Sequence, residues 1–114
     1  MKRINTIKKS TEFKYIIENG DKYKTPYFNY YLVPKKEKYY RIGISVPKKL
    51  GKANLRNKLK RQVRHIITDL AKDFNFTHDC IIIINSNFID LDFNSKIEML
   101  NNLNKHIGDA HENK

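Results

Sequence analysis

The chain has 114 residues, of which 39% are hydrophobic and 31% charged, and its net charge is +11. This composition is too apolar for a disordered chain, and the length predicts one domain, residues 1–114, with a modest core. No apolar run approaches the ~20 residues of a membrane span, and no apolar signal core follows the basic N-terminus, so we expect a cytoplasmic protein. The single cysteine, Cys80, allows no internal disulfide and is predicted to be a buried hydrophobe.

The charge is unevenly distributed along the chain. Residues 1–65 hold 19 Lys and Arg against 4 acids, whereas residues 66–114 hold 4 against 8. No acid occurs from residue 38 to residue 68. A field of one sign costs self-repulsion, so this segregation predicts a polyanionic partner. Nucleic acid is favoured over an anionic membrane surface.

The first half of the chain predicts a tail, a helix and two strands. Residues 1–9 are basic and expected to be flexible. Residues 11–19 have apolar side chains at helical spacing and predict a short helix. Residues 27–33 are aromatic and β-branched and predict a strand, and residues 39–46 alternate as a second strand does. The segment 34–38 between them is compatible with a hairpin loop.

Residues 54–72 predict a long amphipathic helix. Its apolar stripe follows a 3.6-residue period and consists of Leu55, Leu59, Val63, Ile66, Ile67 and Leu70. A broad cationic face occupies the opposite side. A helix lying on a membrane needs its apolar face free, but a domain this small needs that face for its core.

The last third predicts a buried strand and a final helix. Residues 80–84 are apolar without alternation, which indicates a strand covered on both faces. Residues 95–107 predict a helix, with Ser95 and Glu98 fitting a capping box. Residues 108–114 are expected to be flexible. The element order α-β-β-α-β-α defines a single small α+β domain.

No residue pattern indicates a protein active site. The four histidines have no metal-ligand spacing, and no glycine-rich phosphate loop occurs. Asp90 and Asp92 are paired carboxylates, but they precede the final helix, where acids favour the helix N-terminus. No set of nucleophile, base and orienting group is evident.

The stretch RIGISVPKKLGKANLRNKLKRQVRH, residues 41–65, resembles the signature of the protein subunit of bacterial ribonuclease P. The residues that match, without a gap, are Gly43, Ser45, Val46, Lys48, Lys49, Gly51, Ala53, Arg56, Asn57, Lys60, Arg61 and Arg64. The flanking segments FKYIIENG and DCIII match as well. The resemblance therefore covers almost the whole chain.

The resemblance implies a mostly antiparallel sheet of three to four strands with helices packed on it. It also implies a left-handed βαβ crossover, where general experience gives a right-handed one in ~98% of cases. The implied function is that of a ribonucleoprotein subunit: a catalytic RNA removes the 5′ leader of precursor tRNA, and the protein binds both RNAs. The implied partners are one catalytic RNA per protein monomer, and precursor tRNA. The implied Mg²⁺ is held mainly by the RNA, and none is bound tightly by the protein alone.

The resemblance also assigns two sets of residues. Contacts to the catalytic RNA are implied for Lys48, Lys49, Lys52, Arg56, Asn57, Lys58, Lys60, Arg61 and Arg64. A cleft for the leader, between the first helix and the sheet, is implied for Phe13, Ile17, Tyr30 and Ser45. Read without the resemblance, Phe13 and Tyr30 are also compatible with core and strand positions. Three roles stay open for Asn57: capping, a local hydrogen bond, and assisting a hydrated metal ion.

The sequence departs from the family pattern at Pro47, Lys52, Asn54, Lys58 and Asn85. Lys58 keeps the charge of the usual arginine but loses its bidentate geometry. Two other functions stay open. One is an unrelated RNA- or ribosome-binding module. The other is a DNA-binding helix-turn-helix, which is disfavoured because a predicted strand precedes the basic helix.

Overall fold

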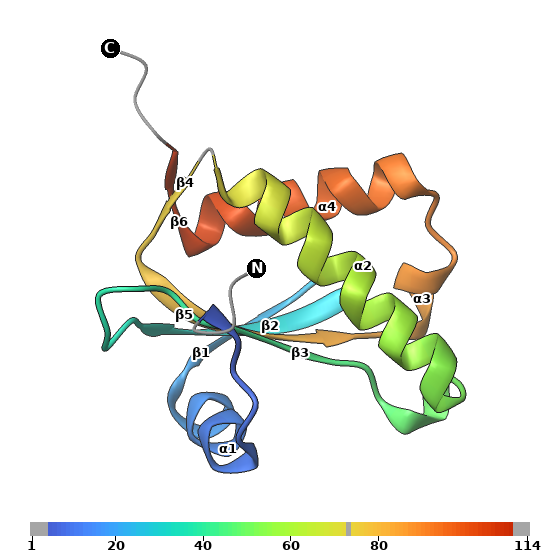
Figure 1. Ribbon diagram of the computed structural model, residues 1–114, viewed down its shortest axis with the longest axis horizontal. Helices are drawn as coiled ribbons and strands as arrows, with labels where there is room; N and C mark the ends of the chain where they lie inside the picture. Colours follow the sequence, from blue (N-terminus) through green and yellow to red (C-terminus); the bar gives the residue numbers. More distant parts are fainter. Residues whose placement is uncertain (1–4, 73, 111–114) are drawn as a thin grey trace.

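The computed structural model describes residues 5–72 and 74–110. A four-stranded sheet separates two helical layers (Figure 1). Helix α1 (Ser10–Asn19) lies on one face of the sheet, and α2 (Ala53–Ala71) and α4 (Phe93–Ile107) lie on the other. The α+β class and the helical cover predicted from the sequence are confirmed.

The sheet has the order β1-β2-β5-β3. Its strands are β1 (Asp21–Lys24), β2 (Phe28–Pro34), β3 (Ile42–Ser45) and β5 (His78–Ile84). The pairs β1–β2 and β2–β5 are antiparallel, whereas β3–β5 is parallel. The predicted hairpin between the strands now seen as β2 and β3 is wrong, because β5 lies between them. The parallel strands β3 and β5 are joined through α2, so the expected βαβ crossover is present. The left-handed sense of this crossover stays a prediction.

Strand β5 occupies the interior of the sheet because its side chains are apolar on both faces. Cys80, Ile82 and Ile84 join the cluster under α2 and α4. Ile81 is fully buried in a second cluster under α1, with Ile83 packed against it. Successive side chains of a strand point to opposite faces of the sheet. An unbroken apolar run therefore requires that both faces be covered. The predicted two-sided burial is confirmed.

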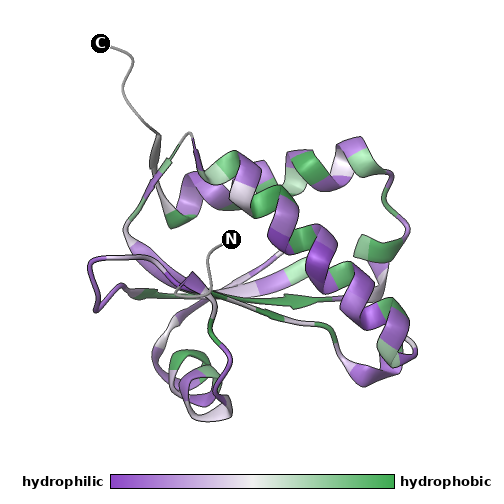
Figure 2. Ribbon diagram, viewed as in Figure 1, coloured by the Kyte–Doolittle hydropathy of each residue, from purple (hydrophilic) through white to green (hydrophobic). Residues whose placement is uncertain are grey.

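The larger core lies between the sheet and the α2/α4 layer. From α2 it receives Leu59, Val63, Ile66 and Ile67, and from α4 it receives Leu100, Leu103 and Ile107. Figure 2 shows green, apolar residues recurring along α2 among purple, polar ones, as an amphipathic helix requires. The predicted stripe is wrong at its first member, since Leu55 is 39% exposed near the start of the helix.

Helix α4 begins earlier than predicted. Its N-cap is Asp92, whose side chain accepts a hydrogen bond from the backbone N–H of Ser95 at 2.7 Å. Hydrogen bonds from Ser95 lower the pKa of Asp92. The predicted capping role of Ser95 is therefore wrong, and the expectation that an acid stands at this helix start is confirmed.

Both chain ends are more structured than expected over their described parts. Asn5 and Ile7 are buried, and Thr6 forms a parallel bridge with Ile42 at the open edge of β3. Short strands β4 (Phe74–Phe76) and β6 (Gly108–Ala110) form a second, two-stranded sheet. The expected flexible segments are thus wrong for residues 5–7 and 108–110. Residues 1–4 and 111–114 lie outside the described residues.

Two further short elements complete the fold: the 3-10 helix η2 (Lys48–Leu50) after β3, and the single turn α3 (Ser86–Ile89) after β5. Within the described ranges, no helix is both long and apolar enough to cross a membrane.

The burial of Cys80 gives a test of this fold. Its side chain is 0% exposed, and burial, together with the charge of Asp79, raises the pKa of its thiol. The thiolate is the reactive form, so iodoacetamide at mildly alkaline pH should leave the native protein unlabelled and add one adduct in concentrated guanidinium. Mass spectrometry measures this, with Cys80→Ala as the blank. Rapid labelling of the native protein would contradict a central position for β5.

Candidate nucleic-acid interface

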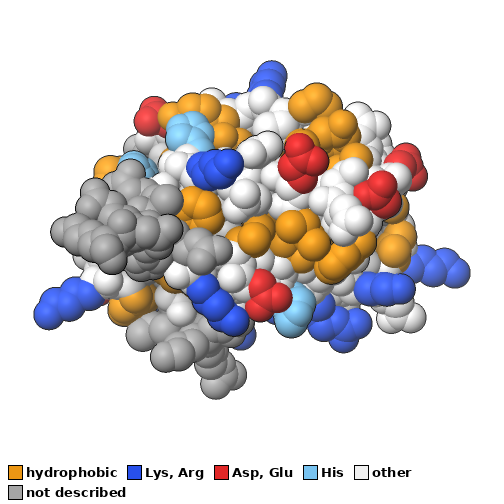
Figure 3. Space-filling view, turned by 90° about the horizontal axis from the view of Figure 1, so that it is seen from above, with side chains coloured by type: hydrophobic (Ala, Val, Ile, Leu, Met, Phe, Trp, Pro, Cys, Tyr) orange, Lys and Arg blue, Asp and Glu red, His pale blue; other side chains and the backbone are white. Residues whose placement is uncertain are grey.

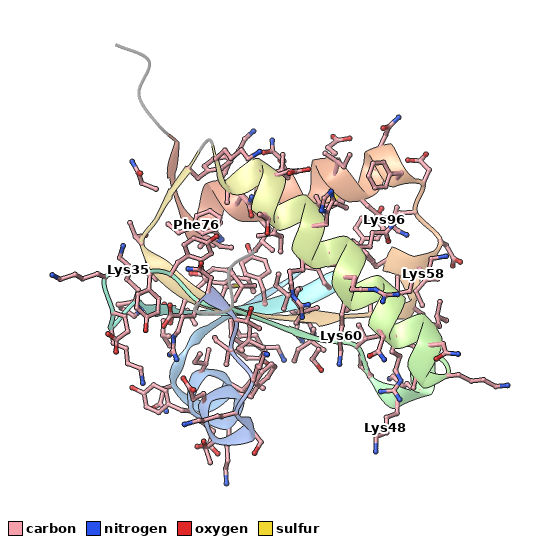
Figure 4. The ribbon with its side chains drawn as sticks, viewed as in Figure 1. Lys35, Lys48, Lys58, Lys60, Phe76 and Lys96 are labelled. Atoms are coloured by element: carbon pink, nitrogen blue, oxygen red, sulfur yellow. The ribbon has the colours of Figure 1, made fainter. Side chains whose placement is uncertain are left out.

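A dense set of cations lies at one end of the molecule, from η2 through the N-cap of α2 to the middle of that helix. We call it the basic surface, and it consists of Asn57 and eight cations: Lys48, Lys49, Lys52, Arg56, Lys58, Lys60, Arg61 and Arg64. Figure 4 shows Lys48, Lys58 and Lys60 at this end and Lys35 at the opposite end of the molecule. The structure thus brings together all the residues predicted to contact the catalytic RNA.

The members of the basic surface differ in burial. Lys48, Lys49, Lys52, Lys58 and Arg61 are exposed, whereas Arg56, Lys60 and Arg64 are half-buried along one side of α2. The half-buried residues follow an i, i+4, i+8 spacing, so they form one row on the helix. Asn57 is exposed, and its side chain makes no hydrogen bond within the described residues. It does not cap the helix, because the N-cap of α2 is Lys52.

The start of α2 is fixed by a glycine and an arginine. Gly51 has φ of +151°, in a region that residues with a Cβ rarely adopt, and a Cβ there would stand 2.7 Å from the Leu55 side chain. Its carbonyl accepts a hydrogen bond from Nε of Arg56 at 3.1 Å. This bond ties the loop that carries Lys48 and Lys49 to the helix that carries the other cations.

The basic surface is not neutralised from within the described residues. The ion pairs among the described residues involve Glu12, Glu18, Asp69 and Asp79. None of these pairs includes a cation of the basic surface. Seen from the α2/α4 side, acids stand over that layer among apolar side chains, while several cations stand at the rim (Figure 3). The cations of the basic surface therefore remain available to a partner of opposite charge.

A second surface lies beside α1 on the other face of the sheet. We call it the Phe13 surface, and it consists of Phe13, Ile17, Asn29, Tyr31, Ser45 and Ile83. The Phe13 ring lies directly on Gly43, since a Cβ at Gly43 would stand 2.7 Å from Cζ of Phe13. The glycine thus lets an aromatic ring approach the backbone of β3.

Two rows of residues cross the sheet at the Phe13 surface. Asn29, Ile83 and Ser45 are register partners and all are half-buried. In the neighbouring row Tyr31 pairs with Ile81, and Nζ of Lys22 lies 5.7 Å from the centroid of the Tyr31 ring. Lys24 pairs with Asn29 at the edge of the sheet. This face therefore offers an aromatic and apolar floor with cations beside it.

The two surfaces are neighbours along the chain. Ser45 ends β3, and Lys48 follows three residues later, which places their Cα atoms at most about 11 Å apart. Ile17 is 37% exposed on α1, next to Phe13 at i+4. A single strand resting on the Phe13 surface would therefore have its phosphates near the lysines of η2.

An ion cluster fastens α1 to the sheet. The Arg41 side chain donates to Glu12 of α1 and, at 3.4 Å, to Oδ2 of Asp79 in β5, while its backbone N–H donates to Oδ1 of Asp79 at 2.9 Å. Burial raises the pKa of Asp79 although Arg41 opposes this. Burial would lower the pKa of Arg41, but its bond to Glu12 and the charge of Asp79 outweigh it and the pKa is raised.

Comparisons with known proteins agree on one family. The Ribonuclease P family model matches residues 1–108. The Mesoplasma florum ribonuclease P protein component is 38% identical over 104 residues, covering 90% of this chain and 94% of its own. The structure of the Thermotoga maritima RNase P protein is similar, with a TM-score of 0.76, 34% identity, and 84% and 91% of the two chains covered. The structure of a Staphylococcus aureus RNase P protein mutant is also similar. Its TM-score is 0.78 and its sequence identity 31%, and the match covers 92% of this chain and 86% of the mutant chain.

This chain belongs to the Ribonuclease P family. The match spans both surfaces and nearly all of the described fold. The resemblance seen in residues 41–65 thus extends to relatives along most of the chain.

One predicted site residue of this Ribonuclease P family member lies on the wrong face. Tyr30 was expected in the same cleft as Phe13, but its ring is 8% exposed in the cluster under α2 and α4. Its hydroxyl lies 2.7 Å from Nδ1 of His106 in α4, and burial raises its pKa. Side chains alternate along β2, so it is the next residue, Tyr31, that faces α1.

Sequence reasoning also missed Asn29, Ile83 and the lysines of β1. The signal that identifies them is the strand register, and the residue pattern of β2 does not reveal it because both of its faces carry aromatic or apolar residues. Among the described residues, no group of three His, Cys, Asp or Glu side chains stands close enough to hold a metal ion.

Proposed function

We propose that this protein is the protein subunit of the ribonuclease P ribonucleoprotein, which removes the 5′ leader from precursor tRNA. In this role it binds the catalytic RNA through the basic surface and the leader through the Phe13 surface. The observation that carries the proposal is the adjacency of these surfaces in a chain of the Ribonuclease P family.

The basic surface suits a folded RNA. Its cations stand on a helix anchored by four buried side chains, Leu59, Val63, Ile66 and Ile67, so their spacing is fixed before binding. Lys and Arg contacts to phosphates give affinity and position but carry no sequence information directly. This property fits a protein that meets one catalytic RNA and leaders of many sequences.

The Phe13 surface suits a single strand. Unpaired bases stack on aromatic side chains irrespective of their sequence, and nearby cations follow the backbone. Phe13 supplies a partly exposed ring, and Tyr31, which is 9% exposed, belongs to the buried floor against which Phe13 packs. Lys22 and Lys24 supply charge on one side, and Lys48 supplies it on the other. Ser45 and Asn29 add hydrogen-bonding groups between the rings and the lysines.

The proposal assigns the cleavage chemistry to the RNA. The Mg²⁺ ions that the reaction needs would be held mainly by the RNA, and the protein would not bind them tightly alone. The protein's own residues bind and orient the two RNAs. One monomer would join one catalytic RNA in the cytoplasm, where precursor tRNA is its substrate.

The most direct test is reconstitution. At low magnesium, adding the protein to transcribed ribonuclease P RNA should restore cleavage of precursor tRNA, because the cations of the basic surface offset phosphate repulsion between the RNAs. Gel analysis of the 5′ leader measures this. The protein alone, treated with nuclease to remove RNA, is the control and should release no leader. Cleavage by that sample, abolished by mutating a carboxylate, would refute the proposal.

A second prediction concerns the salt dependence of binding to the catalytic RNA. Lys58→Ala with Arg61→Ala should reduce the slope of log affinity against log salt by about 1.5, since each lost phosphate contact removes about 0.7–0.9. Both side chains are exposed, so the melting temperature should change little. Arg56 is left intact because it holds the Gly51 carbonyl.

The matched control for this slope is Lys72→Ala with Lys105→Ala. It removes the same two charges from exposed positions outside the basic surface. It should keep a slope close to that of the wild type. Equal slopes for both double variants would show that net charge, and not the basic surface, governs binding.

A third prediction concerns the leader. Phe13→Ala should weaken binding of precursor tRNA more than binding of mature tRNA, by about 1–3 kcal/mol if a base stacks on the ring. Fluorescence binding titrations of both tRNAs to the reconstituted holoenzyme measure the difference. Phe13→Leu keeps much of the packing and removes the aromatic face, so it separates stacking from folding.

Tyr30→Phe is the control for the leader experiment. It removes the hydroxyl that meets His106 on the far face of the sheet, so it should not distinguish the two tRNAs. A selective loss for Tyr30→Phe, or equal losses for both tRNAs with Phe13→Ala, would contradict the assignment of the leader to the Phe13 surface.

A further inference from the structure

A pocket lies on the side of α1 away from Phe13. Tyr15 follows Phe13 by two residues, so at 100° per residue the two rings point to opposite sides of the helix. The pocket has a volume of 540 Å³, within the range of small-ligand sites. It occupies the end of the sheet where β2 ends and β5 begins, whereas Ser45 and Ile83 stand toward the other end.

The walls of the pocket combine an exposed ring with apolar and polar groups. Tyr15 is 56% exposed, and Nζ of Lys36 lies 5.8 Å from the centroid of its ring. Buried Ile16 and the residues Val33 and Pro34 supply apolar lining. Asn19 lies one turn beyond Tyr15 and donates its side-chain amide to the Tyr15 carbonyl at 2.9 Å, so its side-chain oxygen is directed to accept bonds from elsewhere.

The two carboxylates of the pocket share one counter-charge, Arg41. Glu12 and Asp79 both line the pocket, and both bind the Arg41 side chain. Lys36 adds a positive charge near Asp79, where its field lowers the pKa of that carboxyl against the effect of burial. The lining therefore balances two carboxylates against two cations, Arg41 and Lys36. Lys36 belongs to the exposed loop 35–38, where Lys35 and Lys38 outnumber the one acid, Glu37, so the surplus positive charge beside the aromatic wall comes from this loop.

We propose that this pocket binds one unpaired nucleotide, with the base stacked on Tyr15 and the phosphate beside Lys36. An exposed aromatic ring and a lysine over it are the two groups that single-strand sites combine. The nucleotide has two possible sources, the leader of precursor tRNA and an unpaired position of the catalytic RNA. The inference rests on the proposed function only in requiring an RNA partner.

The test measures affinities of Tyr15→Ala for three RNAs: precursor tRNA and mature tRNA with the holoenzyme, and catalytic RNA with the protein. Loss of one stacked base should weaken binding about 5-fold to 150-fold. Tyr15→Phe keeps the ring and should bind like the wild type. Phe93→Ala is the control. It removes a 54% exposed ring of α4, on the face of the sheet opposite α1, and should change no affinity. Thermal unfolding of each variant verifies the fold.

A loss confined to precursor tRNA assigns the pocket to the leader, and a loss for the catalytic RNA assigns it to that RNA. Lys36→Ala should weaken the same RNA as Tyr15→Ala and reduce its salt dependence. The proposal is overturned if Tyr15→Ala binds all three RNAs normally. Phe13→Ala distinguishes failure of the pocket from failure of the proposed function. If Phe13→Ala selectively weakens precursor tRNA while Tyr15→Ala has no effect, the leader still binds the Phe13 surface and only the pocket is refuted. If Phe13→Ala binds normally while Tyr15→Ala weakens binding, the Phe13 surface is refuted and the pocket is supported.

Discussion

The rest of the structure depends on one constraint, that the interior strand β5 is apolar on both faces. Cys80, Ile82 and Ile84 need cover on one side, and Ile81 and Ile83 need it on the other. The strand therefore takes a place between β2 and β3, and helices occupy both faces of the sheet. Burial of apolar area at about 25 cal/mol per Å² makes this arrangement strongly preferred over a sheet with one open face. It also creates two separate layers on which different surfaces can be built.

The two surfaces solve different physical problems with different scaffolds. Phosphates are held by charge, and charge of one sign on a small domain repels itself, so the cations of α2 need a helix that is anchored firmly by its other side. Val63 and Ile67, both 0% exposed, provide that anchor. Bases are held by stacking, which needs a flat floor and little charge. Strands supply such a floor where Gly43 lets the Phe13 ring rest on the backbone.

Sequence reasoning reached the features that depend on periodicity and missed those that depend on register. The helix over 54–72 was predictable because 3.6-residue spacing indicates a helix, and the buried strand over 80–84 was predictable because so short an apolar run has the length of a strand and not of a helix. The order of strands in the sheet was not, since residues 34–38 look like a hairpin loop whichever strand lies beside β2. The sequence predicts Tyr30 in the cleft where the structure has Tyr31, for a related reason. When both faces of a strand carry aromatic residues, the sequence alone does not reveal which residues point to which face. The Arg41 cluster joins α1 and β5 through the residue that precedes β3, and no local pattern connects these three segments.

Helix α1 buries fewer side chains than the helices on the other face of the sheet, α2 and α4. Ile16 is its one buried residue, and the remaining attachment includes the ion pairs of Arg41. Elements with few buried contacts open at lower free energy than the whole domain, as separate cooperative units. Helix α1 also carries Phe13 on one side and Tyr15 on the other, so one opening event dismantles both the Phe13 surface and the pocket beside Tyr15. By linkage, an RNA that binds either surface stabilises the helix and thereby preorganises the other. Two sites that share no residue are thus coupled through the local folding equilibrium of a ten-residue helix.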